Sequence, residues 1–349
     1  MCSSDLAIAH GYYKITDRMM ASALHANIGL LRAPMAIYNA WCDRAPILIL
    51  GATGPWDATQ RRPWIDWIHT SSDQGGLIRN FTKWDNQPGS PAAAQEALLR
   101  ASQIAQTAPR GPVYINLEVK MQEQKIGAMP PLPDAARFPV PPMVRPAPEL
   151  VAQAAKLLSS AKNPVILAGR ASRSMTGWNE RIALAEKLDA PVLSSIKLAA
   201  AFPTTHRLHP IPPFQGLPKS AAALIKSADV ILALDWLDLA GTFKQAYGGE
   251  AIGAKVIHVS CDAHSHRGWS ADYQGLPPAD VYMLCETDAA VPLLLEACAK
   301  RTASVALPAK PALPPIPDAV SLRTVAVALE EATRGVTVSY TRLPLGWNG

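Results

Sequence analysis

Five side chains of the kinds that bind metal ions lie close together in the second half of the sequence. They are His258, Cys261, Asp262, His264 and His266. Imidazole, thiolate and carboxylate groups are the ligands that zinc takes in proteins. However, His258 lies within an apolar run that predicts a strand, and the other four follow the carboxyl end of that run. Because the loops at that edge of a parallel α/β sheet face ligands, we interpret the cluster as a polar loop rather than a metal site.

A histidine near the N-terminus occupies a similar position. His25 ends a mostly apolar run, Met19 to His25, and is followed by Asn27 and Gly29 at the start of a predicted helix. Parallel α/β sheets place ligands at such junctions, although position alone favours a structural histidine. The sequence contains no GxGxxG, Walker A, GxSxG or HExxH motif and no EF-hand loop. No motif therefore defines a reaction by itself.

Four tryptophans are concentrated in one stretch of the chain, at Trp56, Trp64, Trp67 and Trp84. Aromatic side chains in such density can stack the bases of a nucleic acid. Packing in the core and at interfaces explains them better, because the basic residues are scattered and the formal net charge is only +5. Binding to a nucleic-acid backbone requires clustered cations, so we exclude nucleic acid as a partner.

Length and composition limit the class of protein further. A chain of 349 residues predicts two domains, and 49% hydrophobic with 17% charged residues provides enough apolar material for two cores. No apolar run reaches the roughly 18 residues of a membrane-spanning helix, which excludes a membrane protein. Five cysteines without a CxxC pair indicate reduced thiols and a cytoplasmic location.

Proline marks the expected domain boundaries. The 32 prolines are densest in Met129 to Pro148 and in Leu307 to Pro317, where helix is disfavoured and an extended linker is expected. We therefore divide the chain into a first domain over residues 7–126, a linker over 127–148, a central domain over 149–304, and a linker with the start of a further domain over 305–349.

Predicted strands and helices alternate in the first domain. Apolar runs predict strands at Met19 to His25, Pro46 to Leu50 and Pro112 to Leu117, and helical spacing predicts a helix over Ile28 to Cys42. A second helix starts at Ser90-Pro91, with Ser90 as its cap. Its buried stripe is predicted at Ala94, Leu98, Ala101, Ile104 and Ala105.

The same alternation continues in the central domain. Strands are predicted at Val165 to Ala168, Val192 to Ile196, Val230 to Leu234, Val256 to Val259 and Val281 to Cys285. Helices are predicted at Trp178 to Leu188, at Ser220 to Ser227, and from a cap at Thr287 to about Lys300. This pattern predicts an α/β protein with two doubly wound parallel-sheet domains, of which the central one is Rossmann-like.

Five strings of the first domain match a known domain in the same order. They are Leu24 to Gly29, Tyr38 to Trp41, Ala45 to Leu50, Thr82 to Trp84 and Ala108 to Ile115. Together they extend over most of His10 to Gln122 and resemble the pyrimidine-binding domain of thiamine-diphosphate-dependent enzymes. The resemblance is closest to acetolactate synthase large subunits and benzoylformate decarboxylase, and it implies a partial pyrimidine-binding domain here.

Two strings within residues 149–304, Asn163 to Gly169 and Ser227 to Leu234, are similar to strands of the central domain of the same enzymes. In acetolactate synthases this domain holds FAD on a glycine-rich turn. Here the turn is reduced to Gly169-Arg170-Ala171, and Asp235-Trp236 stands where a Gly-Ala type pair is usual. The sequence therefore does not support FAD.

The resemblance also assigns roles to single residues. His25 matches the histidine that benzoylformate decarboxylase-like enzymes use for proton transfer. Asn27 and Gly29 match a turn that faces the cofactor. Gln74 resembles a glutamine on the same side of the cofactor site. The family's ylid-forming glutamate would lie near Cys2 or Ser3, and neither is acidic. We expect thiamine diphosphate and Mg²⁺ as cofactors of the full-length enzyme, with the magnesium site outside this chain.

These observations imply a fragment, truncated at both ends, of a thiamine-diphosphate-dependent 2-keto acid decarboxylase or carboligase that is inactive alone. The string Arg342 to Gly349 resembles the beginning of the missing diphosphate-binding domain. The resemblance implies a homodimer or homotetramer with a 2-keto acid as substrate. The alternative is a non-catalytic nucleotide-binding or regulatory module that uses the central Rossmann-like domain.

Overall fold

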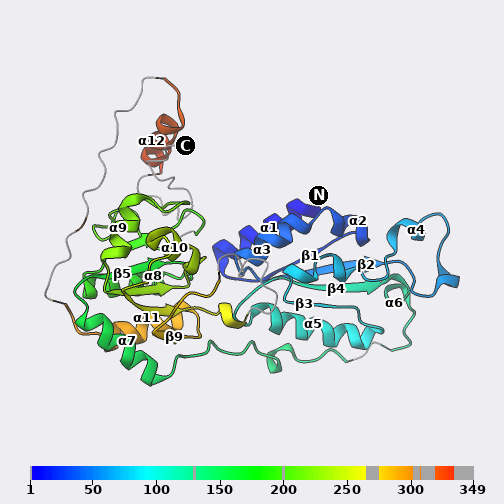
Figure 1. Ribbon diagram of the computed structural model, residues 1–349. Coiled ribbons are helices and arrows are strands. Elements are labelled where there is room, and N and C mark those ends of the chain that lie inside the picture. Colours follow the sequence, from blue (N-terminus) through cyan, green and yellow to red (C-terminus); the bar gives the residue numbers. More distant parts are fainter. Residues whose placement is uncertain are drawn as a thin grey trace. The chain divides into compact units, whose positions relative to one another are not determined.

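The computed structural model describes residues 2–128, 131–198, 201–264, 275–301, 307 and 319–333. These residues fall into two compact units, one built mainly from the chain up to Met143 and the other mainly from Val144 onward. Each unit contains one parallel β-sheet covered by helices (Figure 1). The string Arg342 to Gly349 lies outside the described residues.

The sheet of the first unit contains four parallel strands in the order β1-β2-β4-β3. The strands are β1 (Met20–Ala23), β2 (Ile47–Thr53), β3 (Trp84–Asn86) and β4 (Val113–Glu118). The helices are α1 (Cys2–Thr16), α2 (Ala26–Leu31), α3 (Pro34–Cys42), α4 (Asp66–His69), α5 (Pro91–Gln106) and α6 (Val119–Glu123). Helices α1 and α3 cover one face of the sheet, and α5 covers the other (Figure 1).

The second unit contains a five-stranded parallel sheet in the order β6-β5-β7-β8-β9. The strands are β5 (Pro164–Ala168), β6 (Val192–Ser194), β7 (Val230–Leu234), β8 (Lys255–Val259) and β9 (Val281–Met283). Helices α7 (Pro148–Ser160), α8 (Met175–Leu188) and α11 (Thr287–Ala297) pack on one face, and α9 (Lys219–Ser227) and α10 (Leu239–Tyr247) on the other. A further helix, α12, spans Leu322–Ala332. The strand order reverses between β5 and β7, as in other doubly wound folds.

The predicted doubly wound α/β class is confirmed, and three local predictions are wrong. The helix predicted over Ile28 to Cys42 is broken between α2 and α3, because Pro34 has no N–H to donate to the carbonyl four residues before it. Helix α5 buries a row of alanines, Ala97, Ala101 and Ala105, and Leu98 is 36% exposed. Thr287 is the first residue of α11 and is buried, so it does not act as the cap.

Candidate functional site

Buried polar atoms without a hydrogen-bond partner mark one edge of the first sheet. Among the described residues of the first unit, four such atoms occur: Asn27 Oδ1, Thr53 Oγ1, Thr70 Oγ1 and Gln87 Nε2. Thr53 ends β2, Asn27 follows β1 and Gln87 follows β3, and all three strands run parallel. Buried polar groups are nearly always hydrogen-bonded in proteins. This concentration at the carboxyl edge therefore indicates a place where a polar ligand completes the hydrogen bonds.

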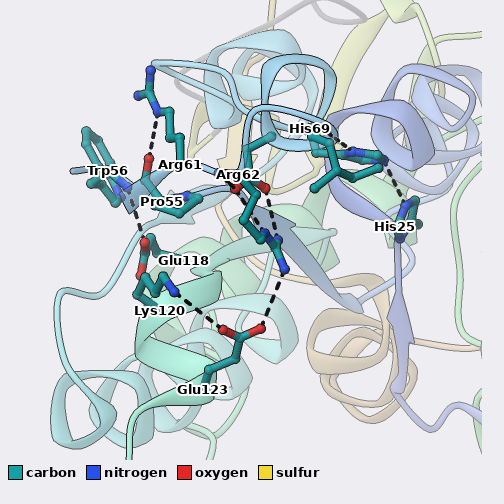
Figure 2. Close-up of polar contacts among 11 residues, drawn as sticks. His25, Pro55, Trp56, Arg61, Arg62, His69, Glu118, Lys120 and Glu123 are labelled. Atoms are coloured by element: carbon teal, nitrogen blue, oxygen red, sulfur yellow. Dashed lines mark hydrogen bonds and ion pairs between the residues drawn. The ribbon is translucent and has the colours of Figure 1, made fainter. Parts of the chain in front are cut away.

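His25 lies at the same edge, directly after β1. Its ring nitrogen Nε2 is 3.1 Å from Nε2 of His69, the last residue of α4 (Figure 2). The two rings meet edge to face, with centroids 4.9 Å apart. His25 is exposed and His69 is half-buried, so a ligand at this edge can reach the pair.

The backbone beside His25 is strained. Ala26 has a φ of +47°, a left-handed conformation that costs a non-glycine residue about 1 kcal/mol or more. Helix α2 starts there, and the amide of Gly29 donates to the carbonyl of His25 at 2.6 Å. Gly29 is buried, whereas the side chain of Asn27 is partly exposed. The structure thus places His25 at the N-cap of α2 and Asn27 and Gly29 in the first turn of that helix.

Gln74, by contrast, is fully buried below this edge. Its Nε2 donates to the carbonyl of Ala52 at 3.0 Å and to the hydroxyl of Tyr114 at 2.7 Å. Burial raises the pKa of Tyr114, so this hydroxyl stays neutral. The amide group of Gln74 therefore fixes the end of β2 through bonds to the protein itself.

A shallow hollow of about 490 Å³ lies beyond β4, lined by Trp56, Gln87, Glu118, Lys120 and neighbouring residues. Glu118 accepts a hydrogen bond from the amide of Trp56 at 3.2 Å (Figure 2). It also accepts one from the amide of Met121 at 2.8 Å, so its carboxylate caps α6 and ties the loop after β2 to it. The orphaned Nε2 of Gln87 belongs to the same wall.

A charged cluster lies between this hollow and the histidine pair (Figure 2). Arg62 holds the buried carboxylate of Asp66 through Nε at 3.1 Å and a terminal nitrogen at 2.9 Å. These hydrogen bonds lower the pKa of Asp66. Arg62 also lies 3.8 Å from Glu123, which in turn is 3.8 Å from Lys120.

Three of the four tryptophans are exposed, which contradicts core packing for them. Trp56, Trp64 and Trp67 are 58%, 73% and 74% exposed, because the segment between β2 and β3 has no long element to cover them. Trp84 packs against the apolar layer under α5. Packing at an interface stays a prediction for the exposed rings.

The predicted polar loop of the central domain is part of an ion-pair network. Arg170 bonds to Asp235 at 3.2 Å and to Asp262 at 2.8 Å, and Ser260 donates to Asp235 at 2.7 Å. His258 is buried, and burial lowers its pKa. Within the described parts of the chain no group of three or more metal-binding side chains is found; His266 lies outside them.

The crevice between β5 and β7 gives no support for FAD at its first turn. The amides of Gly169 and Arg170, which would face a pyrophosphate, donate to the carbonyls of Leu234 and Asp235, both at 2.9 Å. A Cβ atom on Gly169 would lie 2.1 Å from the carbonyl oxygen of Asp235, so the two strand ends are in backbone contact. The turn therefore offers no free amides for phosphate at these two positions.

Sequence comparisons relate this two-unit α/β chain to known enzymes. Residues 151–271 match the family described as thiamine pyrophosphate enzyme, central domain. The chain is 27% identical to a benzoylformate decarboxylase of Pseudomonas aeruginosa over 266 residues, which cover 74% of this chain and 48% of that one. It is 26% identical to the acetolactate synthase large subunit of Corynebacterium glutamicum over 264 residues, 73% of this chain and 40% of that one. The chain thus spans less than half the length of these relatives.

Solved structures show the same fold. A crystal structure of a putative thiamin diphosphate-dependent enzyme from Mycobacterium smegmatis superposes on 99% of this chain and 66% of its own length, with a TM-score of 0.75 and 20% identity. The fold defines a protein with two parallel-sheet α/β units. The match to the central domain of the thiamine pyrophosphate enzymes covers residues 151–271 of this chain.

No helix among the described residues is long and apolar enough to cross a membrane. The sequence prediction located His25, Asn27 and Gly29 after the carboxyl end of a strand, and the structure has them there, after β1. That this edge binds a ligand stays a prediction. The sequence prediction missed His69, Thr70 and Gln87, which lie in short or irregular segments without apolar periodicity. The sequence signal for this segment was His69 itself, which directly precedes a polar stretch that had been predicted as neither helix nor strand.

Proposed function

We propose that this chain carries the pyrimidine-binding and central parts of a thiamine-diphosphate-dependent decarboxylase or carboligase acting on 2-keto acids. The observation that supports this most is the set of orphaned polar atoms at the carboxyl edge of the first sheet, where His25 also lies and where the resemblance puts the cofactor. The central-domain match supports the family independently. The amides of Gly169 and Arg170 donate to backbone carbonyls after β7. This arrangement gives no support to the alternative of a non-catalytic nucleotide-binding module.

The residues at this edge fit the aminopyrimidine half of thiamine diphosphate. An aminopyrimidine ring offers both donors and acceptors, and the edge offers an unpaired acceptor on Asn27 and an unpaired hydroxyl on Thr53. When bound, the cofactor supplies the carbanion that attacks a keto group and the electron sink for decarboxylation. Magnesium, which would bridge its diphosphate to protein carboxylates, is proposed on the family resemblance alone.

The residues of this chain would bind, orient and exchange protons. Asn27 and Gly29 would shape the turn against the cofactor, with Gln74 holding β2 behind it. His25, exposed at the edge, would accept a proton from the substrate side and return it, as a histidine in such a site can. The chain does not supply a carboxylate at Cys2 or Ser3, so a glutamate for the cofactor would have to come from elsewhere.

The test is an assay of the longest reading frame of the source gene that includes this chain. We expect release of CO₂ from benzoylformate or pyruvate that requires thiamine diphosphate and Mg²⁺. His25→Ala should lower kcat by about a hundredfold or more, whereas His206→Ala, in the second unit, should not. The proposal fails if no 2-keto acid is decarboxylated under these conditions, or if His25→Ala turns over as fast as the parent.

A homodimer or homotetramer in the cytoplasm completes the proposal. Its support is a set of exposed apolar side chains on the first unit, Leu31, Met35, Trp64 and Trp67, since such groups often lie at subunit contacts. Light scattering during size-exclusion chromatography would measure the mass, and a monomer at all concentrations would contradict this part.

A further inference from the structure

The contact between His25 and His69 fixes where one proton lies. Nδ1 of His69 lies 2.9 Å from the carbonyl oxygen of Ile65. Because a carbonyl oxygen only accepts hydrogen bonds, Nδ1 of His69 must carry a hydrogen. In a neutral imidazole the other nitrogen then has a lone pair, so Nε2 of neutral His69 can only accept.

The same logic determines the form of His25. Its Nε2 is 3.1 Å from Nε2 of His69, and a hydrogen bond at this distance needs a single hydrogen between the two atoms. When both rings are neutral, that hydrogen belongs to His25, and the lone pair of His25 lies on Nδ1. Hydrogens on both Nε2 atoms would point at one another and repel, so the contact between the two atoms holds a single hydrogen.

Among the described residues that pack beside the pair, no further charged side chain is hydrogen-bonded to either ring. Helix α2 (Ala26–Leu31) and strand β2 (Ile47–Thr53), which pack beside the pair, contain no ionisable side chain. On α4 the nearest carboxylate is Asp66, and it is held by Arg62 through two side-chain contacts. Among the described residues, each histidine is therefore the one ionisable side chain that hydrogen-bonds to the other.

We propose that His69 is a positioning residue that holds one proton between the two Nε2 atoms and thereby makes Nδ1 of His25 the nitrogen that exchanges protons with a bound ligand. The last part rests on the function proposed above. A proton taken up at Nδ1 gives a cation whose Nε2–H still donates to His69, and its return to the ligand restores the neutral pair. The number of protons is conserved, and no further reactant is needed.

The test is nitrogen-15 NMR of the labelled chain, which needs no catalytic activity. We expect His69 in the Nδ1–H form, His25 in the Nε2–H form, and a scalar coupling between the two Nε2 nitrogens across the hydrogen bond. His69 in the Nε2–H form, or absence of the coupling, would overturn the proposal.

Two variants extend the test to function. His69→Gln keeps an acceptor oxygen near the position of Nε2, and His69→Phe keeps only a ring. In the longest reading frame, His69→Phe should shift the pH profile of kcat while His69→Gln retains it, and His206→Phe is the control for loss of a histidine elsewhere. An unchanged profile in His69→Phe overturns the positioning role. If His25→Ala leaves turnover intact while the NMR coupling is present, the proposed function fails and the shared proton stands.

Discussion

At the scale of single residues, one carboxylate connects two helices of the first unit. Asp43, which follows α3, accepts hydrogen bonds from His10 at 2.9 Å and Lys14 at 2.7 Å, both on α1. Burial alone would raise the pKa of Asp43, but these hydrogen bonds lower it to about 2. Because the pKa in the folded state is below the ordinary value of 3.8, the ionised group stabilises the fold above that value, and the contribution is lost as pH falls through 2.

We therefore expect Asp43→Asn to lower the free energy of unfolding by about 2 kcal/mol at neutral pH and by far less near pH 2. Urea denaturation at both pH values measures this. The matched control is Asp17→Asn, because Asp17 is 64% exposed in its pair with Arg110 and exposed ion pairs contribute about 0 to 1 kcal/mol. Equal losses at the two pH values for Asp43→Asn would contradict the assignment.

The residues of the candidate site could be predicted from the sequence only where they follow an apolar run that predicts a strand. His25 and Asn27 follow β1, and the rule that parallel strands present ligands at their carboxyl ends places them correctly. His69 lies 44 positions further along the chain on a four-residue helix. Such a short helix has no periodicity, and its position depends on the Arg62–Asp66 contact, which only the folded chain reveals.

At the scale of elements, the junction of β5 and β7 requires a glycine at position 169, because a side chain there would meet the backbone of Asp235. The amides of Gly169 and Arg170 continue the hydrogen bonding of the two strands past their ends. A Cβ atom on Gly169 would lie 2.1 Å from the carbonyl oxygen of Asp235. Backbone cannot rotate away as a flexible side chain would, so the strand ends would have to separate.

Gly169→Ala should therefore destabilise the protein by about 3 kcal/mol or more. The control is Gly216→Ala in the same unit, because a Cβ there would have no neighbour within 4 Å. Urea denaturation of both variants against the parent gives the comparison. If the two substitutions cost the same, the close approach at Gly169 does not limit the side chain.

The start of α5 gives a second prediction for an element. The hydroxyl of Ser90 accepts a hydrogen bond from the amide of Ala93 at 3.2 Å, and Pro91 occupies the first turn. Ser90→Ala should cost about 1 kcal/mol of stability, whereas Ser90→Gly should cost only a few tenths. Thermal unfolding of the three proteins distinguishes them, and equal stability of Ser90→Ala and parent would count against the cap.

The elements themselves followed from the sequence to differing degrees. Buried parallel strands such as β7 are continuous apolar runs and were located residue by residue, because both faces are covered. Helices α1, α4, α6, α7, α10 and α12 were missed. In α7 the proline-rich stretch before Pro148 masked the start of the helix, although proline is common at the first helical turn.

At the scale of the whole molecule, each unit has its own apolar layers on both faces of its sheet. The cysteines whose side chains the structure describes are outside disulfides and differ in burial between the two units. Cys285 and Cys298 lie in the core of the second unit, and Cys42 is partly exposed in the first. Burial raises the pKa of Cys285 to about 12 and that of Cys298 to about 11.

These thiols provide a readout for the folding of the second unit. Alkylation requires the thiolate, so at pH 8 we expect Cys285 and Cys298 to react with iodoacetamide at least about a hundredfold more slowly in the native protein than in urea. Mass spectrometry of peptides after short pulses measures each site, with Cys42 as the internal control that reacts in native buffer. Gly169→Ala should move the labelling of both buried cysteines to a lower urea concentration, because the substitution weakens the sheet against which they pack. Rapid native labelling of Cys285 would instead mean that the second unit opens without unfolding, and its buried core would then not be the barrier that protects the thiol.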